Sequence, residues 1–257
     1  MPKLSEKRIK ELKAGYNPER YTFKGLISEF LNSIYHLGQK KIIHTAIELT
    51  IRPAKAIKNV IRGFRQYLYN PLEYLIVIAT LISLFNNRYH FFSNEATTIM
   101  NNNDTQTGIY QFSFFHEHKN FFHDFFKYSE DYPSVVNIVA IPVFAFYTYV
   151  FFRKYKIHFG ESIVLNTFIT AQQLLFLIFL VPFDEFLPTS KEVLLSIYTF
   201  FTIIFNIWVY VTFFEGKIAP KLLRAIAVVF VSYFLQLPLN ALVYYIFKPV
   251  FELISKL

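Results

Sequence analysis

The chain has 257 residues, of which 54% are hydrophobic, 20% aromatic and 17% charged, and its formal net charge is +8. A water-soluble domain of this length usually carries fewer apolar and aromatic residues and more charge. Because the apolar residues gather into long uncharged runs, the composition excludes an ordinary soluble protein. With no cysteine, it also excludes disulfides, thiol catalysis and cysteine-ligated zinc.

The N-terminal region, residues 1–66, is predicted to form basic amphipathic helices on the cytosolic side of a membrane. Thr22 is a suitable N-cap for a helix over Phe23–Leu37, whose apolar residues recur at helical spacing. A second helix over about Lys41–Ile51 should stop before Pro53, because proline disfavours helical geometry in the residue before it.

A third helix is predicted from Pro53, with one basic and one apolar face. Such a helix tends to lie in the membrane interface, where its cations meet anionic headgroups. Two interpretations stay open: a stop-transfer anchor whose cations only set topology, or a surface that recognises acidic lipid or a protein partner. The candidate lipid-facing residues are Lys55, Lys58, Arg62 and Arg65.

Five apolar segments follow within residues 67–257, and each is predicted to cross the membrane. About 20 apolar residues span a hydrocarbon core of roughly 30 Å. The first segment contains Glu73 near its start, and the other four contain no charged residue or histidine. The sequence therefore predicts an all-α integral membrane protein with about five transmembrane helices. The segments are Leu68–Phe85, Ser134–Phe152, Ile163–Phe183, Val193–Phe214 and Ala225–Phe247.

The segments between these spans alternate in charge. Residues 1–69 carry 14 Lys and Arg against 5 Asp and Glu, whereas residues 86–133 are net negative. Since cytoplasmic segments carry the excess of Lys and Arg, we predict a cytosolic N-terminus, an outer loop over 86–133 and an external C-terminus. The basic charge adjoins a span, so the phospholipid bilayer and its acidic headgroups are the expected partners, and nucleic acid is not.

The outer loop holds a group of histidines near Glu117 and Asp124. Catalytic zinc sites usually take three protein ligands, but the loop has no HExxH-type spacing. A polar face beneath a row of phenylalanines is the preferred interpretation, and no cofactor is predicted. The weak metal candidates are His116, His118 and His123.

Three spans carry polar residues on one helix face. Amide and hydroxyl groups cannot stay unpaired in hydrocarbon, so they either bond between helices or line a polar path. No ionisable residue lies in the middle of a span, which disfavours an ion-coupled pump, and no nucleophile motif is recognisable. The residues concerned are Asn166, Thr170, Gln173, Thr202, Asn206, Gln236 and Asn240.

Four stretches carry a family resemblance. They are Thr22-Phe23-Lys24 with Ser28-Glu29-Phe30; Arg52-Pro53 with Ile57; Gly63-Phe64-Arg65 through Tyr69-Asn70-Pro71; and Pro142–Ala145 with Phe152-Arg153 and Gly160-Glu161. Over about residues 21–185 the chain resembles bacterial multi-pass membrane proteins of domain-of-unknown-function family 3667. It lacks the four-cysteine zinc ribbon with which longer members begin. Its architecture also resembles that of the Yip1-type membrane proteins.

The resemblance implies a bacterial cytoplasmic membrane and carries over no activity. We therefore expect a non-enzymatic scaffold or membrane-organising factor, which could bind a protein partner or a second copy of itself. A transporter or permeation factor for a neutral or amphipathic solute is the alternative. A membrane enzyme is the least favoured.

Overall fold

The regular elements of the described residues are all helices. This computed structural model describes residues 20, 22–25, 27, 39–66, 68–89, 128, 133–183 and 191–254. The elements are α3 (Gln39–Ile51), α4 (Pro53–Ile61), α5 (Pro71–Tyr89), α9 (Pro133–Phe151), a short 3-10 helix η2 (Arg153–Tyr155), α10 (Phe159–Leu180), α12 (Lys191–Phe213) and α13 (Ile218–Ile254).

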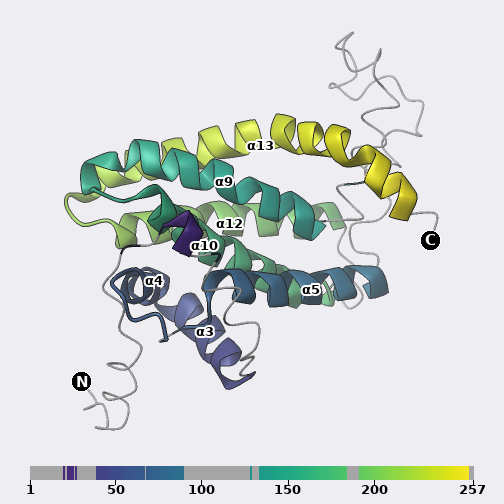
Figure 1. Ribbon diagram of the computed structural model, residues 1–257, viewed down its shortest axis with the longest axis horizontal. Helices are drawn as coiled ribbons and strands as arrows, with labels where there is room; N and C mark the ends of the chain where they lie inside the picture. Colours follow the sequence, from purple (N-terminus) through teal and green to yellow (C-terminus); the bar gives the residue numbers. More distant parts are fainter. Residues whose placement is uncertain are drawn as a thin grey trace.

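The long helices form a bundle around α10. In Figure 1, α9, α10, α12 and α13 run side by side along the long axis, and α5 runs along one half of the same bundle. The other half of that side is occupied by α3 and α4, which both pack against α10. Of the apolar stretch of α10, 72% is buried, the largest share among the long helices.

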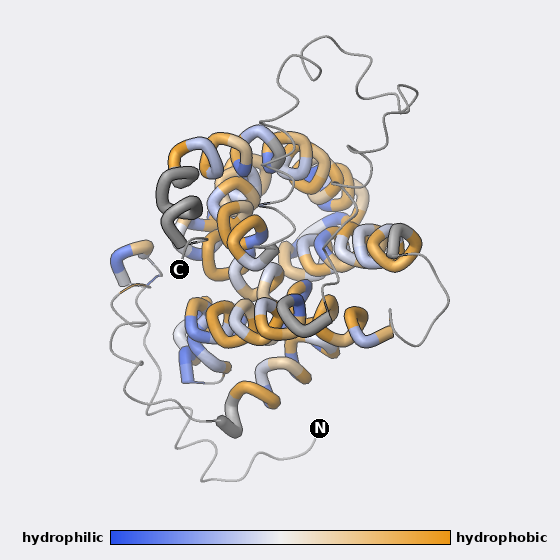
Figure 2. The backbone as a smooth tube through the Cα atoms, turned by 90° about the vertical axis from the view of Figure 1, so that its right-hand side faces the viewer, coloured by the Kyte–Doolittle hydropathy of each residue, from blue (hydrophilic) through white to orange (hydrophobic). Residues whose placement is uncertain are grey.

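Within the described residues, four helices are long and apolar enough to cross a membrane, and the chain is accordingly a multi-pass membrane protein. Their apolar stretches are Ser134–Phe151, Phe159–Leu180, Val193–Phe213 and Ile218–Ile246. Hydrophobic colouring dominates the bundle in Figure 2. The first predicted span corresponds to α5, whose apolar stretch is shorter, Pro71–Asn86. A fifth crossing therefore stays a prediction.

The predicted helix break at Pro53 is confirmed. The helix α3 ends at Ile51, and α4 begins with Pro53 in its first turn, where the missing N–H costs no hydrogen bond. Near the N-terminus, the Thr22 hydroxyl accepts a hydrogen bond from the Gly25 N–H at 3.1 Å, as an N-cap does. The rest of the predicted helix over Phe23–Leu37 lies outside the described residues, apart from Ile27.

The prediction that the basic face of the third helix includes Arg65 is wrong. The helix stops at Ile61, and Arg62 is its C-cap residue. Gly63 follows with a φ of +107°, a left-handed conformation that glycine adopts without steric cost. Because the chain turns there, Arg65 does not continue the helical register, and only Lys55 and Lys58 lie on the helix itself.

The apolar face of α4 is covered by protein. Ile57 and Val60 are 0% and 1% exposed, and α4 packs on α3, α10 and α12. Insertion of this face into the membrane interface, which its amphipathic pattern favours, is therefore not how α4 is used. Burial against the neighbouring helices already removes its apolar side chains from water.

The start of α5 follows from its cap. The Leu72 N–H donates to the Asn70 side-chain oxygen at 3.1 Å, and Pro71 occupies the first helical position. Midway along α5, the Ala79 carbonyl accepts a hydrogen bond from the hydroxyl of Ser134 on α9 at 2.9 Å. The helix α5 is thus tied to the spans along its side.

At the end where α10 begins, aromatic rings join α9 to α12. Phe152 is fully buried and stacks on Phe214, with ring centroids 3.9 Å apart and planes 8° apart. Beside this stack, the buried Lys221 ammonium donates to the Val211 carbonyl at 2.8 Å and the Phe214 carbonyl at 2.9 Å. A lysine here satisfies carbonyls that the end of α12 leaves unpaired. We call this end, with its exposed Arg153, Lys154, Lys156 and Lys217, the basic end of the bundle.

Candidate functional site

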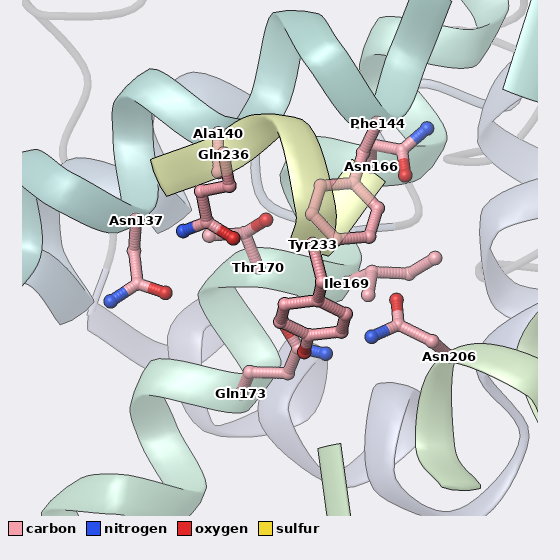
Figure 3. A pocket seen from close by; sticks show the side chains of 10 residues that line it. All are labelled: Asn137, Ala140, Phe144, Asn166, Ile169, Thr170, Gln173, Asn206, Tyr233 and Gln236. Carbon is pink, nitrogen blue, oxygen red and sulfur yellow. The ribbon is translucent and has the colours of Figure 1, made fainter. Parts of the chain in front are cut away.

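A small polar cavity lies between the four long apolar helices. Side chains from α9, α10, α12 and α13 converge on it (Figure 3). Its free volume is about 20 Å³, and a cavity of at least about 10–15 Å³ holds one water molecule. The lining residues are Asn137, Ala140, Phe144, Asn166, Ile169, Thr170, Gln173, Asn206, Tyr233 and Gln236.

One wall of the cavity is held by Asn166, whose side chain is fully engaged in hydrogen bonds. Its amide nitrogen donates to the Ser162 carbonyl at 2.8 Å and to the Thr148 hydroxyl at 3.2 Å. Its amide oxygen accepts from the Tyr210 hydroxyl at 2.5 Å. Since Thr148 lies on α9 and Tyr210 on α12, this amide connects three helices in a low-dielectric interior, where hydrogen bonds are strong.

A second group of hydrogen bonds centres on Thr202 of α12. Its carbonyl accepts from the Asn206 amide at 2.9 Å and from the Gln173 amide at 3.4 Å. Its hydroxyl is 3.3 Å from the hydroxyl of Tyr233 on α13. The ring of Tyr233 also packs edge-on against Phe144, with centroids 5.3 Å apart. The α13 side of the cavity is thus held by a long hydrogen bond and a ring contact.

The structure brings most of the predicted polar residues to this one place. Asn166, Thr170, Gln173, Asn206 and Gln236 line the cavity directly. Thr202 is buried behind the lining and organises it through the bonds described above. Asn240 is also buried, one helical turn beyond Gln236, but it is not among the lining residues.

Sequence reasoning missed Asn137 and two tyrosines. Asn137 has only Ser134, three residues before it, as a polar neighbour at helical spacing, so its span shows no polar row like those of the other three. Tyr210 and Tyr233 read as apolar in spans rich in aromatic residues, although a buried tyrosine hydroxyl usually finds a partner. One sequence signal could have indicated them. Each predicted amide needs several hydrogen-bonding partners once it is buried, and the tyrosines of neighbouring spans are candidates for these partners.

The chemistry of the lining is neutral. Asn166, Gln173, Asn206 and Gln236 offer amide groups that both donate and accept, and Thr170 offers a hydroxyl. Tyr233 is the one lining residue with an ionisable side chain, and the lining contains no carboxylate and no cation. Such a site can hold water or the uncharged polar groups of a solute, and it has no side chain suited to bind a metal ion tightly.

The predicted basic residues serve partly in internal contacts. Lys58 and Arg62 approach the Glu215 carboxylate at 3.2 and 3.6 Å, and the Lys58 ammonium lies 5.8 Å from the centroid of the Phe213 ring. Lys55 is exposed, and Arg65 is half-buried in the turn after α4. Exposed pairs of this kind contribute only about 0–1 kcal/mol to stability. These pairs place α4 beside the basic end of the bundle but add little to the free energy of folding.

The weak metal candidates His116, His118 and His123 lie outside the described residues. Within the described part of the chain, no group of three or more His, Asp or Glu side chains is placed to hold a metal ion.

The comparisons with known proteins add no relative. No family model, no curated protein and no solved structure matches the chain. The resemblance to domain-of-unknown-function family 3667 therefore stays a prediction that rests on the four stretches quoted above.

Proposed function

We propose that the bundle admits a small neutral solute, or the polar part of an amphipathic one, at the polar cavity and lets it cross the membrane. The observation that carries the proposal is the depth of the cavity. At 1.5 Å per residue, Asn166 and Gln173 lie about 10 and 21 Å from the start of α10, in the middle of a helix about 33 Å long. Polar binding sites of transporters lie near this depth.

The cavity as it stands has room for a water molecule, so a larger solute needs the helices to separate. Such a separation would break the long hydrogen bond between α12 and α13. Tyr233 of α13 meets Thr202 of α12 at 3.3 Å, whereas α10 and α12 are joined by the 2.5 Å bond between Asn166 and Tyr210. Movement of α13 away from α12 would expose the amides of Gln173 and Asn206 to an incoming solute.

Glycerol uptake by proteoliposomes tests this function. Stopped-flow light scattering should show glycerol entering vesicles that carry the protein severalfold faster than protein-free vesicles. Thr170→Val and Asn206→Leu should bring the rate back toward that of protein-free vesicles, because each removes a polar group from the lining. Water permeability measured on the same vesicles separates a water path from a solute path.

The matched control is Thr199→Val, since this exposed hydroxyl bonds to the Leu195 carbonyl of its own helix, outside the cavity. Its vesicles should behave as those of the unmodified protein. Rates for the unmodified protein equal to those of protein-free vesicles for both glycerol and water would refute the permeation function. So would lining variants as fast as the control.

A second candidate is a scaffold or membrane-organising factor that recruits acidic lipid at the basic end. It is supported by the exposed cations Lys55, Arg153, Lys154, Lys156 and Lys217, which come from three separate segments. Exposed cations next to a membrane attract anionic headgroups by about 1 kcal/mol each. The acidic lipid would then concentrate around the protein.

Native mass spectrometry after extraction from mixed-lipid nanodiscs tests the lipid contact. The double variant Lys154→Gln/Lys156→Gln should retain less phosphatidylglycerol than the unmodified protein, and the difference should shrink as salt is raised. Lys154→Arg/Lys156→Arg, which keeps both positive charges, should retain as much as the unmodified protein. Equal retention by all three proteins would argue against a charge-dependent lipid site.

The topology belongs to the same proposal. A crossing by α5 and a cytosolic basic end are supported by the alternation of charge and by the apolar stretch of α5. A bacterial cytoplasmic membrane is proposed from the family resemblance alone. Because the chain has no cysteine, an impermeant thiol reagent can report the side on which Lys217→Cys lies. Labelling of Lys217→Cys from outside intact cells would show that the orientation is opposite to the one proposed.

A further inference from the structure

The helix α3 has one face buried in the protein and one apolar face that no described residue covers. Thr45 and Leu49 are 0% and 1% exposed on the inner face. On the outer face, Ile43, Ile47 and Ile51 are 68%, 51% and 62% exposed, and their spacing of four residues aligns them in one row. Three aligned, exposed isoleucines need an apolar environment.

The helix α3 is attached to the middle of α10. The Gln172 amide nitrogen donates to the Thr50 hydroxyl at 2.7 Å and to the Ala46 carbonyl at 3.4 Å. The Gln172 oxygen accepts from the Tyr74 hydroxyl at 3.0 Å. At 1.5 Å per residue, Gln172 lies about 20 Å from the first residue of α10. Thus α3 sits beside the apolar part of a span and not beyond its end.

The helix α3 lies next to the start of α5, which also has exposed apolar side chains. The Tyr69 N–H, just before α5, donates to the Thr45 hydroxyl of α3 at 2.9 Å, and both helices lie on the same side of the bundle (Figure 1). The exposed apolar side chains of α5 are Ile76, Leu81 and Leu84.

The charges at the C-terminal end of α3 fit this placement. The Arg52 guanidinium bonds to the Glu48 carboxylate at 2.9 Å, which neutralises the acidic residue in the second half of the helix. Arg52 stays more than half exposed just after the helix end, from where a long side chain can reach the headgroups.

We propose that α3 is inserted into the bilayer, with Ile43, Ile47 and Ile51 in contact with lipid acyl chains. The leaflet concerned is the one on the side of the membrane where α10 begins. This insertion makes α3 a membrane-embedded helix that does not cross, so the membrane domain begins before residue 67. Lipid is the occupant that fits the row, because the Gln172 bonds hold α3 beside the apolar part of a long apolar helix, where acyl chains receive exposed apolar side chains.

Single-cysteine variants of the full-length protein test this insertion, since the chain has no native cysteine. Ile43→Cys, Ile47→Cys and Ile51→Cys would each be labelled with an environment-sensitive fluorophore and reconstituted into phosphatidylcholine vesicles. We expect severalfold stronger quenching by nitroxide-labelled acyl chains than at Lys217→Cys, and severalfold weaker quenching by aqueous iodide. Phe230→Cys is the lipid-side control, because Phe230 is 72% exposed within the apolar stretch of α13, and it should behave like the isoleucine positions.

Two results would overturn the insertion. Strong iodide quenching with weak lipid quenching at the three positions places α3 in water. Protection from both quenchers means that protein covers the row, either a second copy or another segment of this chain. The substituted side chains are exposed, so the fold should survive, and a size-exclusion profile like that of the unmodified protein checks this. The outcome is independent of the permeation assay, because Ile43, Ile47 and Ile51 do not line the polar cavity.

Discussion

Replacing Phe152 with alanine is expected to lower the free energy of unfolding by about 3–5 kcal/mol, the range for Phe→Ala in a packed core. Phe152 is 0% exposed and stacks on Phe214 with ring centroids 3.9 Å apart. The rings of Tyr155 and Tyr210 lie 5.8 and 6.0 Å away. Alanine would leave a cavity enclosed by rigid aromatic rings, which cannot close around it.

Equilibrium unfolding in mixed micelles, followed by circular dichroism, would measure this loss. Phe146→Ala is the matched control, because Phe146 lies on α9, which ends one residue before Phe152, and is 50% exposed. Its removal leaves no closed cavity, so its effect should be well below that of Phe152→Ala. Equal losses for the two variants would contradict the packing role of the Phe152 stack.

Replacing Asn166 with leucine is expected to lower the free energy of unfolding by about 1–3 kcal/mol, because the buried Tyr210 hydroxyl loses its 2.5 Å acceptor and keeps only the Thr148 hydroxyl, 3.3 Å away. Thr148 loses a donor at the same time. Individual hydrogen bonds between membrane helices average about 0.6 kcal/mol, so the loss of two accounts for roughly 1 kcal/mol. The rest of the range is the cost of keeping a polar group buried after it has lost a partner. The three helices that Asn166 connects should separate more readily.

A rescue experiment identifies the cause. In the triple variant Asn166→Leu/Thr148→Val/Tyr210→Phe, neither of the buried hydroxyls that bond to Asn166 remains, so part of the loss should be recovered. The measurement is the same unfolding titration, with Thr212→Val as the control, since this exposed hydroxyl bonds to carbonyls of its own helix. A triple variant less stable than Asn166→Leu alone would show that side-chain shape, and not an unpaired hydroxyl, sets the cost.

Local signals were sufficient to predict several helix boundaries. Pro53 separates α3 from α4, and Asn70 with Pro71 opens α5. Proline and capping side chains act on backbone groups within a few residues, so their effect can be predicted without the rest of the fold. The end of α4 was missed because the charge periodicity appeared to run on to Arg65, while the turn at Gly63 had already broken the register.

The polar cavity was predictable only in part. Helical spacing put Asn166 and Gln173 on one face of their helix, and both line the cavity. The spacing could not show that Asn166 would bond to Tyr210 of another helix. Contacts between helices depend on their rotation and depth relative to one another, which a pattern within a single helix does not contain.

By itself, the sequence determines the class of this protein, the positions of its apolar helices and which face of each amphipathic helix is apolar. Only the tertiary structure decides what covers each of those faces. The helices α3 and α4 both have apolar faces, yet Ile57 of α4 is enclosed by protein while Ile47 of α3 faces outward. Removing an apolar side chain from water is favourable whether lipid or protein receives it, so the same periodicity is compatible with either environment.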